Sequence, residues 1–255
     1  MIADFPDTAV ILAAGQGTRL LPYTKDHPKC MLPFDGVPLI SLQIRCFLMC
    51  GIERIVVVTG YGSEVVEDWL GDSVEYVHNA DFQTTSSMYS LWLGLSKVDK
   101  GCFILNSDVL FHPEILRRLA TDPHSEALAM DFDAHLNEEE MKVKVEGSRV
   151  VALSKSLRDG HGENVGLLKF SAYGKQRLQE TIGLLLEQGF RKEMVPFAVD
   201  RLAAEMYIEA VPVAGLPWIE IDFPEDYERA LNEIFPRIRG DIAGFEVDRR
   251  WPKYP

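Results

Sequence analysis

The stretch Ile11-Leu-Ala-Ala-Gly-Gln-Gly-Thr-Arg-Leu20 decides how the rest of this chain is read. It begins within the apolar run Ala9–Ala14, which predicts a buried strand. The run breaks at Gly15 and Gly17, where the missing side chains let the backbone approach a ligand closely. Backbone N–H groups in such a turn can hold an anion, and Arg19 adds donors that suit phosphate oxygens. The stretch therefore predicts a strand that ends in a phosphate-binding turn.

Two familiar phosphate motifs do not fit this turn. The Walker form needs Lys-Ser or Lys-Thr after its last glycine, and neither follows here at that spacing. The dinucleotide fingerprint needs a third glycine where this chain has Leu20. A second basic residue, Lys29, follows in the segment Pro28-Lys-Cys-Met-Leu-Pro33. Because a plain turn between a strand and a helix requires neither Arg19 nor Lys29, we interpret the turn as functional.

Together, the two segments resemble the signature of the nucleotidyltransferases that make sugar nucleotides and CDP-alcohols. That family carries L-A-A-G-x-G-[TS]-R-L and then P-K-x-[ML]-[LV]-P, and residues 12–20 and 28–33 match both. The resemblance implies an α/β fold: a Rossmann-like, mainly parallel sheet flanked by helices, with an antiparallel substrate or lid subdomain (a GT-A-like nucleotidyltransferase fold). It also implies nucleotide binding by Leu12, Ala13, Ala14, Gly15, Gly17, Thr18, Arg19 and Lys29.

Length and charge narrow the classes of function. The 255 residues suffice for one large α/β domain. The 26 basic and 39 acidic residues give a net charge of -13, which argues against nucleic acid or an anionic membrane as a partner. No apolar window approaches the roughly 20 residues of a membrane span, so we expect a cytoplasmic protein. A homodimer is compatible with the sequence.

Apolar runs alternate with segments of helical period through the first half, as in a parallel sheet covered on both faces. We expect strands there at 8–14, 54–59, 74–78 and 101–109, and helices at 38–50, 63–70, 84–97 and 112–122. The second half predicts strands at 126–133, 142–145, 149–154, 165–171, 207–213 and 218–222, and helices at 173–188, 193–206 and 224–238. One domain should cover 1–238, with a nucleotide part at about 8–122 and 215–238, an acceptor or lid part at about 123–214, and a tail at 239–255.

Two aspartates at strand ends form the expected metal site. Asp108 and Asp222 each follow an apolar run, where a carboxylate loses hydration unless it binds something positive. Magnesium (Mg²⁺) prefers one or two carboxylates together with substrate phosphates and water, so the pair predicts a magnesium site. The segments L-N-S-D-V and W-I-E-I-D-F-P-E-D also resemble the family segments that carry its metal aspartates. Asp222 could instead cap the helix that begins at Pro224.

Hydroxyl residues at the start of the expected helix 84–97 are a second candidate nucleotide contact. The segment T-T-S-S-M-Y-S-L-W can cap a helix or donate to a ligand, and we assign Thr85, Ser86 and, further on, Ser107 to the nucleotide. The phosphocholine branch of the family typically reads T-N-N-x-x-S-L-W here. Serines at 86 and 87 replace its two asparagines, which leaves the recognition of the base or acceptor open.

Residues 139–171 resemble that branch in particular, the cytidylyltransferases that act on phosphocholine and related phosphorylated or phosphonate amino compounds. The segments are E-E-M-K-V, V-A-L-S-K-S-L and G-E-N-V-G-L-L-K-F-S. The resemblance implies an acceptor site with Lys142 and Lys155 facing the phosphates and Glu163 at the acceptor end. The positive end of such an acceptor needs acidic or aromatic neighbours, so we add Tyr173 to this site. We expect Arg19, Lys29 and Lys155 to be catalytic because they can neutralise phosphate charge. Lys142 alternates with two valines and could instead belong to a solvated strand face.

We therefore expect a magnesium-dependent enzyme that transfers CMP from CTP to a small phosphorylated or phosphonate amino compound and releases pyrophosphate. Two alternatives remain. One is a sugar-1-phosphate nucleotidyltransferase that uses UTP, dTTP or GTP. The other is a nucleotide-binding module without activity, which would be expected to lack the metal aspartates or the signature charges.

Overall fold

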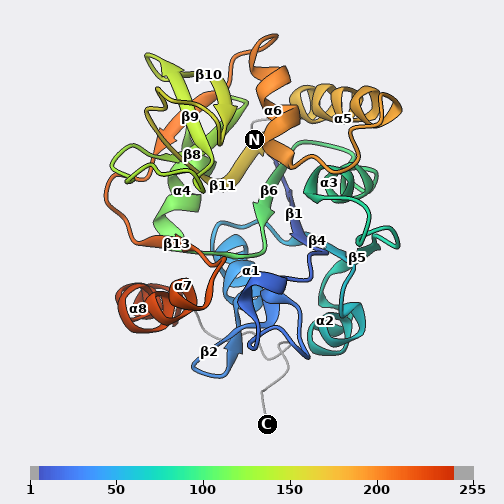
Figure 1. Cartoon of the computed structure of the whole chain (residues 1–255), viewed down its shortest axis with the longest axis vertical. Helices are drawn as coiled ribbons and strands as arrows, with labels where there is room; N and C mark the ends of the chain where they lie inside the picture. Colours follow the sequence, from blue (N-terminus) through green and yellow to red (C-terminus); the bar gives the residue numbers. More distant parts are fainter. Residues whose placement is uncertain (1–5, 244–255) are drawn as a thin grey trace.

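A computed structural model describes residues 6–243 of the chain. Its main sheet has the strand order β5-β4-β1-β6-β11-β8-β12-β10-β9 (Figure 1). The strands are β1 (Thr8–Ala13), β4 (Arg54–Thr59), β5 (Glu75–His78), β6 (Cys102–Asn106), β8 (Ala127–Asp131), β9 (Lys142–Glu146), β10 (Arg149–Ser154), β11 (Gly162–Phe170) and β12 (Glu209–Pro212). The helices are α1 (Leu39–Met49), α2 (Ser63–Leu70), α3 (Ser87–Leu95), α4 (Pro113–Thr121), α5 (Ala172–Glu187), α6 (Val195–Ala203), α7 (Pro224–Arg229) and α8 (Phe235–Ala243).

The first half of the chain forms the parallel part of the sheet. β1 is buried along its whole length and pairs in parallel with β4 and β6, and β4 pairs in parallel with β5. A strand buried on both faces needs apolar residues throughout, which is what the run before the glycine turn supplies. The two signature segments continue as short 3-10 turns, Thr18–Leu20 and Lys29–Met31.

The second half extends the same sheet, mainly with antiparallel pairs. β11 runs antiparallel to both β6 and β8, and β10 runs antiparallel to β9 and β12. The expected hairpin joins β9 and β10, and Gly147 supplies the positive φ of its turn. The acceptor or lid part proposed from the sequence therefore continues the sheet that β1 and β6 belong to.

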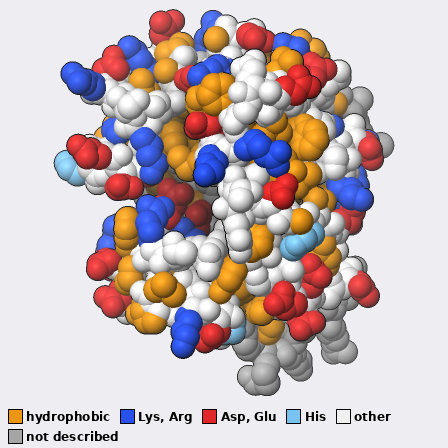
Figure 2. Space-filling model, turned by 45° about the vertical axis from the view of Figure 1, so that its right-hand side comes forward, with side chains coloured by type: hydrophobic (Ala, Val, Ile, Leu, Met, Phe, Trp, Pro, Cys, Tyr) orange, Lys and Arg blue, Asp and Glu red, His pale blue; other side chains and the backbone are white. Residues whose placement is uncertain are grey.

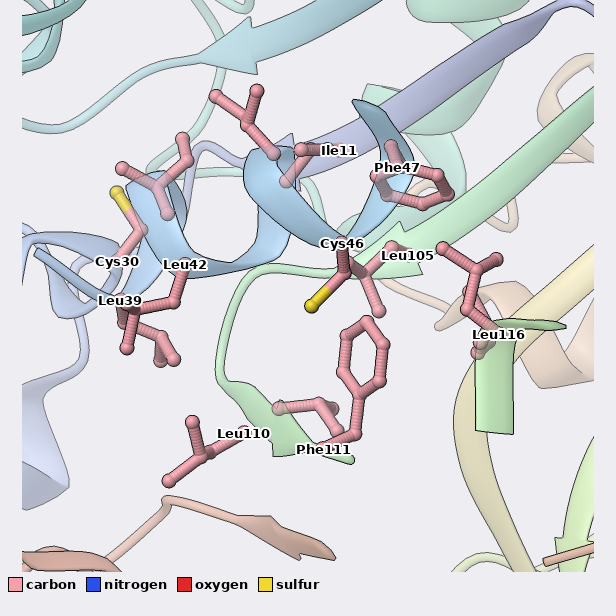
Figure 3. Close-up of a cluster of buried hydrophobic side chains, with 14 of the residues drawn as sticks. Ile11, Cys30, Leu39, Leu42, Cys46, Phe47, Leu105, Leu110, Phe111 and Leu116 are labelled. Atoms are coloured by element: carbon pink, nitrogen blue, oxygen red, sulfur yellow. The ribbon is translucent and has the colours of Figure 1, made fainter. Parts of the chain in front are cut away.

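Alternate residues of β1 enter two separate apolar cores. Ala9, Ile11 and Ala13 pack with α1, α2, α4, α7 and α8, whereas Val10 and Leu12 pack with α3, α5 and α6. On the first face, side chains of α1 such as Leu39 and Cys46 lie near Leu110 and Phe111 (Figure 3). The sheet is thus covered on both faces, as expected.

A short ribbon outside the main sheet joins two distant segments. β7 (Val109–Phe111) pairs antiparallel with β13 (Trp218–Glu220), and Val109 lies opposite Glu220. The N–H of Ile221 donates to the carbonyl of Asp108 at 3.0 Å. This pairing brings Asp108 next to Asp222, which lies 114 residues further along the chain (222 − 108). A second ribbon pairs β2 (Pro33–Phe34) with β3 (Val37–Pro38).

Several expected elements differ at their ends. The expected strand 101–109 is broken by a turn at 107–108. The expected helix 84–97 begins only at Ser87, because the N–H groups of Thr84 and Thr85 donate to the carbonyl of Asp81 in a turn before it. The expected helix 224–238 contains a π-helical segment, Ala230–Ile234, and continues to Ala243. The first residues of the proposed tail are therefore helical, and its remainder lies outside the described residues. None of the helices between residues 6 and 243 combines the length and the apolar character that a membrane span needs.

Candidate active site

A cleft of about 370 Å³ opens at the carboxyl ends of β1 and β6, where ligands bind in open α/β sheets. Figure 2 shows a hollowed face with acidic side chains deep between basic ones. Most residues proposed from the sequence line this cleft: Leu12, Ala14, Gly15, Gly17, Thr18, Arg19, Lys29, Thr85, Ser86, Ser107, Asp108, Lys155 and Asp222. Segments far apart in the sequence are thus brought together, as a shared site requires.

The glycine turn has the geometry of a ligand cradle. Gly17 has a φ of 65°, which favours glycine, and a Cβ at this position would lie 3.1 Å from Cβ of Lys29. Thr24 Oγ1 donates to the carbonyl of Gly17 at 2.7 Å and fixes the turn. A Cβ at Gly15 would meet no protein atom within 4 Å. The backbone at Gly15 therefore faces open space that a phosphate can enter.

Lys29 links the two candidate metal aspartates. Its Nζ donates to Asp108 Oδ2 at 2.9 Å and to Asp222 Oδ1 at 2.5 Å. Burial alone would lower the pKa of Lys29, but the charges of Asp108 and then Asp222 outweigh it and raise the pKa above its ordinary value. Burial alone would raise the pKa of Asp222, but the charge of Lys29 outweighs burial and keeps this pKa below its ordinary value. Lys29 and Asp222 are therefore both charged at neutral pH.

Asp222 does not cap helix α7. The residue before the helix is Phe223, and its N–H donates to Asp226 Oδ2 at 2.9 Å. The N–H of Asp222 also donates to Asp226 Oδ2, at 3.1 Å. Asp226 thus satisfies the free amides at the start of the helix, and the Asp222 carboxylate remains available to the cleft.

Arg19 and Lys155 reach the cleft from opposite parts of the chain. Arg19 Nη2 donates to Asp222 Oδ2 at 2.7 Å, and its guanidinium lies over the Phe223 ring at 4.9 Å. Glu139 Oε2 lies 3.5 Å from Arg19 Nη1 and 3.6 Å from Lys155 Nζ. The Glu139 carboxylate therefore bridges two cations that are suited to phosphate oxygens.

The carboxylates fit a divalent cation. Asp108 Oδ1 is buried and has no hydrogen-bond partner among residues 6–243, while Oδ2 contacts Lys29. A free, buried carboxylate oxygen beside a second carboxylate is the donor set that Mg²⁺ prefers. A second acidic group, formed by Asp122, His124 and Glu209, has ligand atoms within 4.8 Å of one another. None of those three residues lines the cleft, so we assign that group no part in the reaction.

Two further carboxyl groups have raised pKa values: Glu220, which lines the cleft, and Glu163, which does not. Burial first, and then the charges of Asp108 and Asp222, raise the pKa of Glu220 to about 8. Burial, Glu140 and Asp131 raise the pKa of Glu163 to about 7. Sequence reasoning missed Glu220, although the period of a strand places residues 220 and 222 on the same face.

The start of α3 forms another wall of the cleft. Asn79, which the sequence did not indicate, is buried and donates to Thr85 Oγ1 at 3.1 Å and to Ser90 Oγ at 3.0 Å. Ser87 Oγ accepts from the N–H of Val195, which ties α3 to α6. This wall therefore offers hydroxyl groups held by a buried amide. The lining residues that were not proposed also include Phe82, Asn106, Met141, Asn164, Met194 and Pro196.

Four proposed residues do not line the cleft. Tyr173 is 65% exposed in the first turn of α5, so its assignment to the acceptor stays a prediction that this cleft does not support. Lys142 is buried and its Nζ donates to the carbonyl of Lys155 at 2.6 Å, so it supports Lys155 instead of facing phosphate. Ala13 points into the core on the α1 face. Glu163 is half-buried behind the lining, near enough for its charge to affect Glu220.

Comparison of the sequence with protein-family models shows the family of this chain. The family model described as "MobA-like NTP transferase domain" matches residues 9–137, just over half of the chain. The chain belongs to this family. The matched range contains the glycine turn, Lys29 and Asp108.

Curated relatives cover most of the chain. The chain is 29% identical to CMP-5'-(3-aminopropyl)phosphonate synthase of Streptomyces rubellomurinus. The match covers 88% of this chain but only 38% of the length of that protein. It is 26% identical to CTP:phosphoglutamine cytidylyltransferase of Campylobacter jejuni, over 88% of this chain and 99% of that one. A UTP–glucose-1-phosphate uridylyltransferase of Haloferax volcanii is 30% identical over 42% of this chain and 45% of its own.

Solved structures show the same fold. The inositol-1-phosphate CTP transferase of T. maritima aligns with a TM-score of 0.78 at 24% identity, over 92% of this chain and 97% of that one. The CTP:phosphocholine cytidylyltransferase of Streptococcus pneumoniae aligns with a TM-score of 0.71 at 23% identity, over 87% of this chain and 96% of its own. The expected fold class is therefore confirmed.

Proposed function

We propose that this protein transfers CMP from CTP to a small phosphorylated or phosphonate compound that carries a positively charged amine, and releases pyrophosphate. The observation that carries the proposal is the half-buried Glu220 carboxyl, which lines the cleft together with Asp108 and Asp222 and whose environment includes the Glu163 carboxyl outside the lining. A carboxyl that is buried beside other acids becomes ionised at neutral pH when it gains a positive partner. An acceptor ammonium would supply it.

The triphosphate of CTP would bind over the glycine turn. The open space at Gly15, together with Arg19 and Lys155, supports this placement, because backbone amides and basic side chains suit phosphate oxygens. The hydroxyl groups of Thr85 and Ser86 would then contact the nucleoside. CTP is named for the Campylobacter relative, and CMP for the Streptomyces relative.

The reaction needs no covalent enzyme intermediate. An acceptor oxygen would form a bond to the α-phosphorus of CTP as the bond to the bridging oxygen of the β-phosphate breaks, and pyrophosphate leaves. Lys29, Arg19 and Lys155 would stabilise the charge on the phosphates by position and electrostatics. A magnesium ion held by Asp108 and Asp222 would add Lewis-acid stabilisation of the phosphate oxygens.

The experiment is a pyrophosphate-release assay with each NTP against pooled acceptors. We expect release with CTP and 2-aminoethylphosphonate, phosphoethanolamine or phosphocholine. Release with a sugar 1-phosphate alone would contradict the acceptor class. Binding of CTP without release under any acceptor would point to a nucleotide-binding module without activity.

A sugar-1-phosphate nucleotidyltransferase is the second candidate. The amides of Asn106 and Asn164 line the cleft and could bind sugar hydroxyls. The Haloferax relative acts on glucose 1-phosphate by its name, but its match is limited to 112 residues. The buried acidic groups favour the cationic acceptor.

A further inference from the structure

Gln43 is a buried amide on α1 that contacts the turn carrying Asp108 and does not line the cleft. Its Nε2 donates to the carbonyl of Asn106 at 3.1 Å and to the carbonyl of Val109 at 2.8 Å. Asn106 ends β6 and Val109 begins β7. A single amide group thus holds both ends of the turn in which Asp108 sits.

Only the donor side of this amide is hydrogen-bonded. Gln43 Oε1 is buried and has no partner among the described residues, and an unsatisfied buried acceptor lowers stability. Its neighbours on α1 are apolar, and Figure 3 shows Leu39, Leu42 and Cys46 on the side of Leu110 and Phe111. An apolar side chain would avoid the unsatisfied oxygen but would leave the carbonyls of Asn106 and Val109 without this donor. The position of the turn is therefore the property that the amide secures.

The same turn is tied to the other candidate metal aspartate. The carbonyl of Asp108 accepts a hydrogen bond of 3.0 Å from the N–H of Ile221, the residue that directly precedes Asp222. Both carboxylates meet at Lys29 Nζ. A shift of the turn would therefore change the separation of the two carboxylates, and a misplacement of about 1 Å in such a site can cost about a hundredfold in rate.

We propose that Gln43 is a positioning residue, which acts through the turn to hold Asp108 where a divalent cation meets the phosphates. The inference rests on the metal role proposed for Asp108. Partners that orient metal ligands typically contribute about 10–100-fold to metal affinity or activity, although they touch neither metal nor substrate.

The test compares Gln43→Met, which removes both donors at similar volume, with Ile44→Val. Ile44 is equally buried on the same helix, and its side chain has no hydrogen-bond donor. For Gln43→Met we expect kcat to fall by about tenfold or more, with a change in the KM for the nucleotide of less than about twofold. Affinity for Mn²⁺ in the presence of CTP without acceptor, measured by paramagnetic resonance, should also fall by about tenfold.

A double-mutant cycle separates positioning from general damage. In an Asp108→Asn background, Gln43→Met should lower the affinity for Mn²⁺ in the presence of CTP by less than a further factor of about two, because the two residues act as one unit. A full, additive loss there would overturn the proposal. So would a Gln43→Met protein that matches Ile44→Val in kcat and in Mn²⁺ affinity. If Gln43→Met does not fold, Gln43→Asn takes its place. Asn keeps the amide but is one methylene shorter, so the amide should no longer reach both carbonyls, and the expected results are the same.

The two proposals fail in different experiments. A wrong acceptor class appears in the wild-type protein, as turnover of a different substrate, and the Gln43 cycle then uses that substrate. The Mn²⁺ titration requires no acceptor. Unchanged Mn²⁺ affinity in Gln43→Met therefore counts against the positioning role alone.

Discussion

Lys29 Nζ lies between two carboxylates, 2.9 Å from Asp108 Oδ2 and 2.5 Å from Asp222 Oδ1. The signature segment that follows the glycine turn is thereby joined to two strand ends that are distant in sequence. In this arrangement one ammonium balances two acids next to the phosphate cradle. Loss of any of the three charges should change catalysis more than folding.

Lys29→Ala should fold and lose most of its turnover. Removal of the ammonium that balances both carboxylates beside the proposed phosphate site should raise the barrier by about 3 kcal/mol, or a hundredfold or more in rate. Steady-state pyrophosphate release and circular dichroism measure the two properties. A folded variant with wild-type turnover would end the assignment of Lys29 to catalysis.

Asp108→Asn and Asp222→Asn should each abolish metal-dependent turnover, and the double variant should be little worse than either. The reason is that both carboxylates are expected to serve one cation. Asp226→Asn is the control, because Asp226 caps the helix. An active Asp222→Asn enzyme would remove that residue from the site.

Glu220→Gln should weaken binding of a cationic acceptor and reduce its dependence on pH. The pKa of Glu220 is about 8 because burial and the nearby aspartates disfavour its charge, so the free carboxyl is largely protonated at neutral pH. An ammonium needs the carboxylate, so the wild-type acceptor KM should fall as the pH rises from about 6 toward about 8. Glu228→Gln, on an exposed carboxylate, is the control. A wild-type KM that rises over this range would contradict the role of Glu220.

The same raised pKa predicts the sign of a stability effect. Because the pKa of Glu220 is higher in the folded state than its ordinary value of 4.5, the contribution of Glu220 to stability is greatest at low pH and falls as the pH rises from 4.5 through about 8. Glu220→Gln should therefore unfold at a higher temperature than wild type above about pH 8 and at a similar temperature near pH 4.5. Thermal melts without ligand measure this difference. A variant that is less stable at high pH would contradict it.

Glu139→Gln should lower the KM for the nucleotide. The Glu139 carboxylate bridges Arg19 and Lys155 and would compete with phosphate for both. Exposed ion pairs are worth about 0.2–1 kcal/mol, so the change should be at most about fivefold. Glu138→Gln is the matched control, since Glu138 forms no ion pair with any residue between 6 and 243. Equal KM values for the two variants would contradict the competition.

The sequence predicted the parallel half of the sheet and most of the cleft, because strand ends and glycine turns are local signals. It missed Gln43, since a glutamine in a helix usually indicates a solvated face and its role depends on a turn 63 residues away. The sequence could not show that Tyr173 lies outside the lining of the cleft, because the orientation of α5 depends on tertiary packing. It also could not show that Lys142 donates to the carbonyl of Lys155, because no sequence pattern marks that carbonyl.

The central claim, that this cleft joins CMP to a cationic acceptor, is tested most directly by side-by-side kcat/KM values. The assay pairs CTP with 2-aminoethylphosphonate, phosphoethanolamine or phosphocholine, and CTP or UTP with glucose 1-phosphate, and measures pyrophosphate. We predict that a cationic acceptor with CTP gives the highest value, at least about tenfold above either sugar phosphate reaction. A higher value for glucose 1-phosphate would contradict the acceptor assignment and leave nucleotidyl transfer in place.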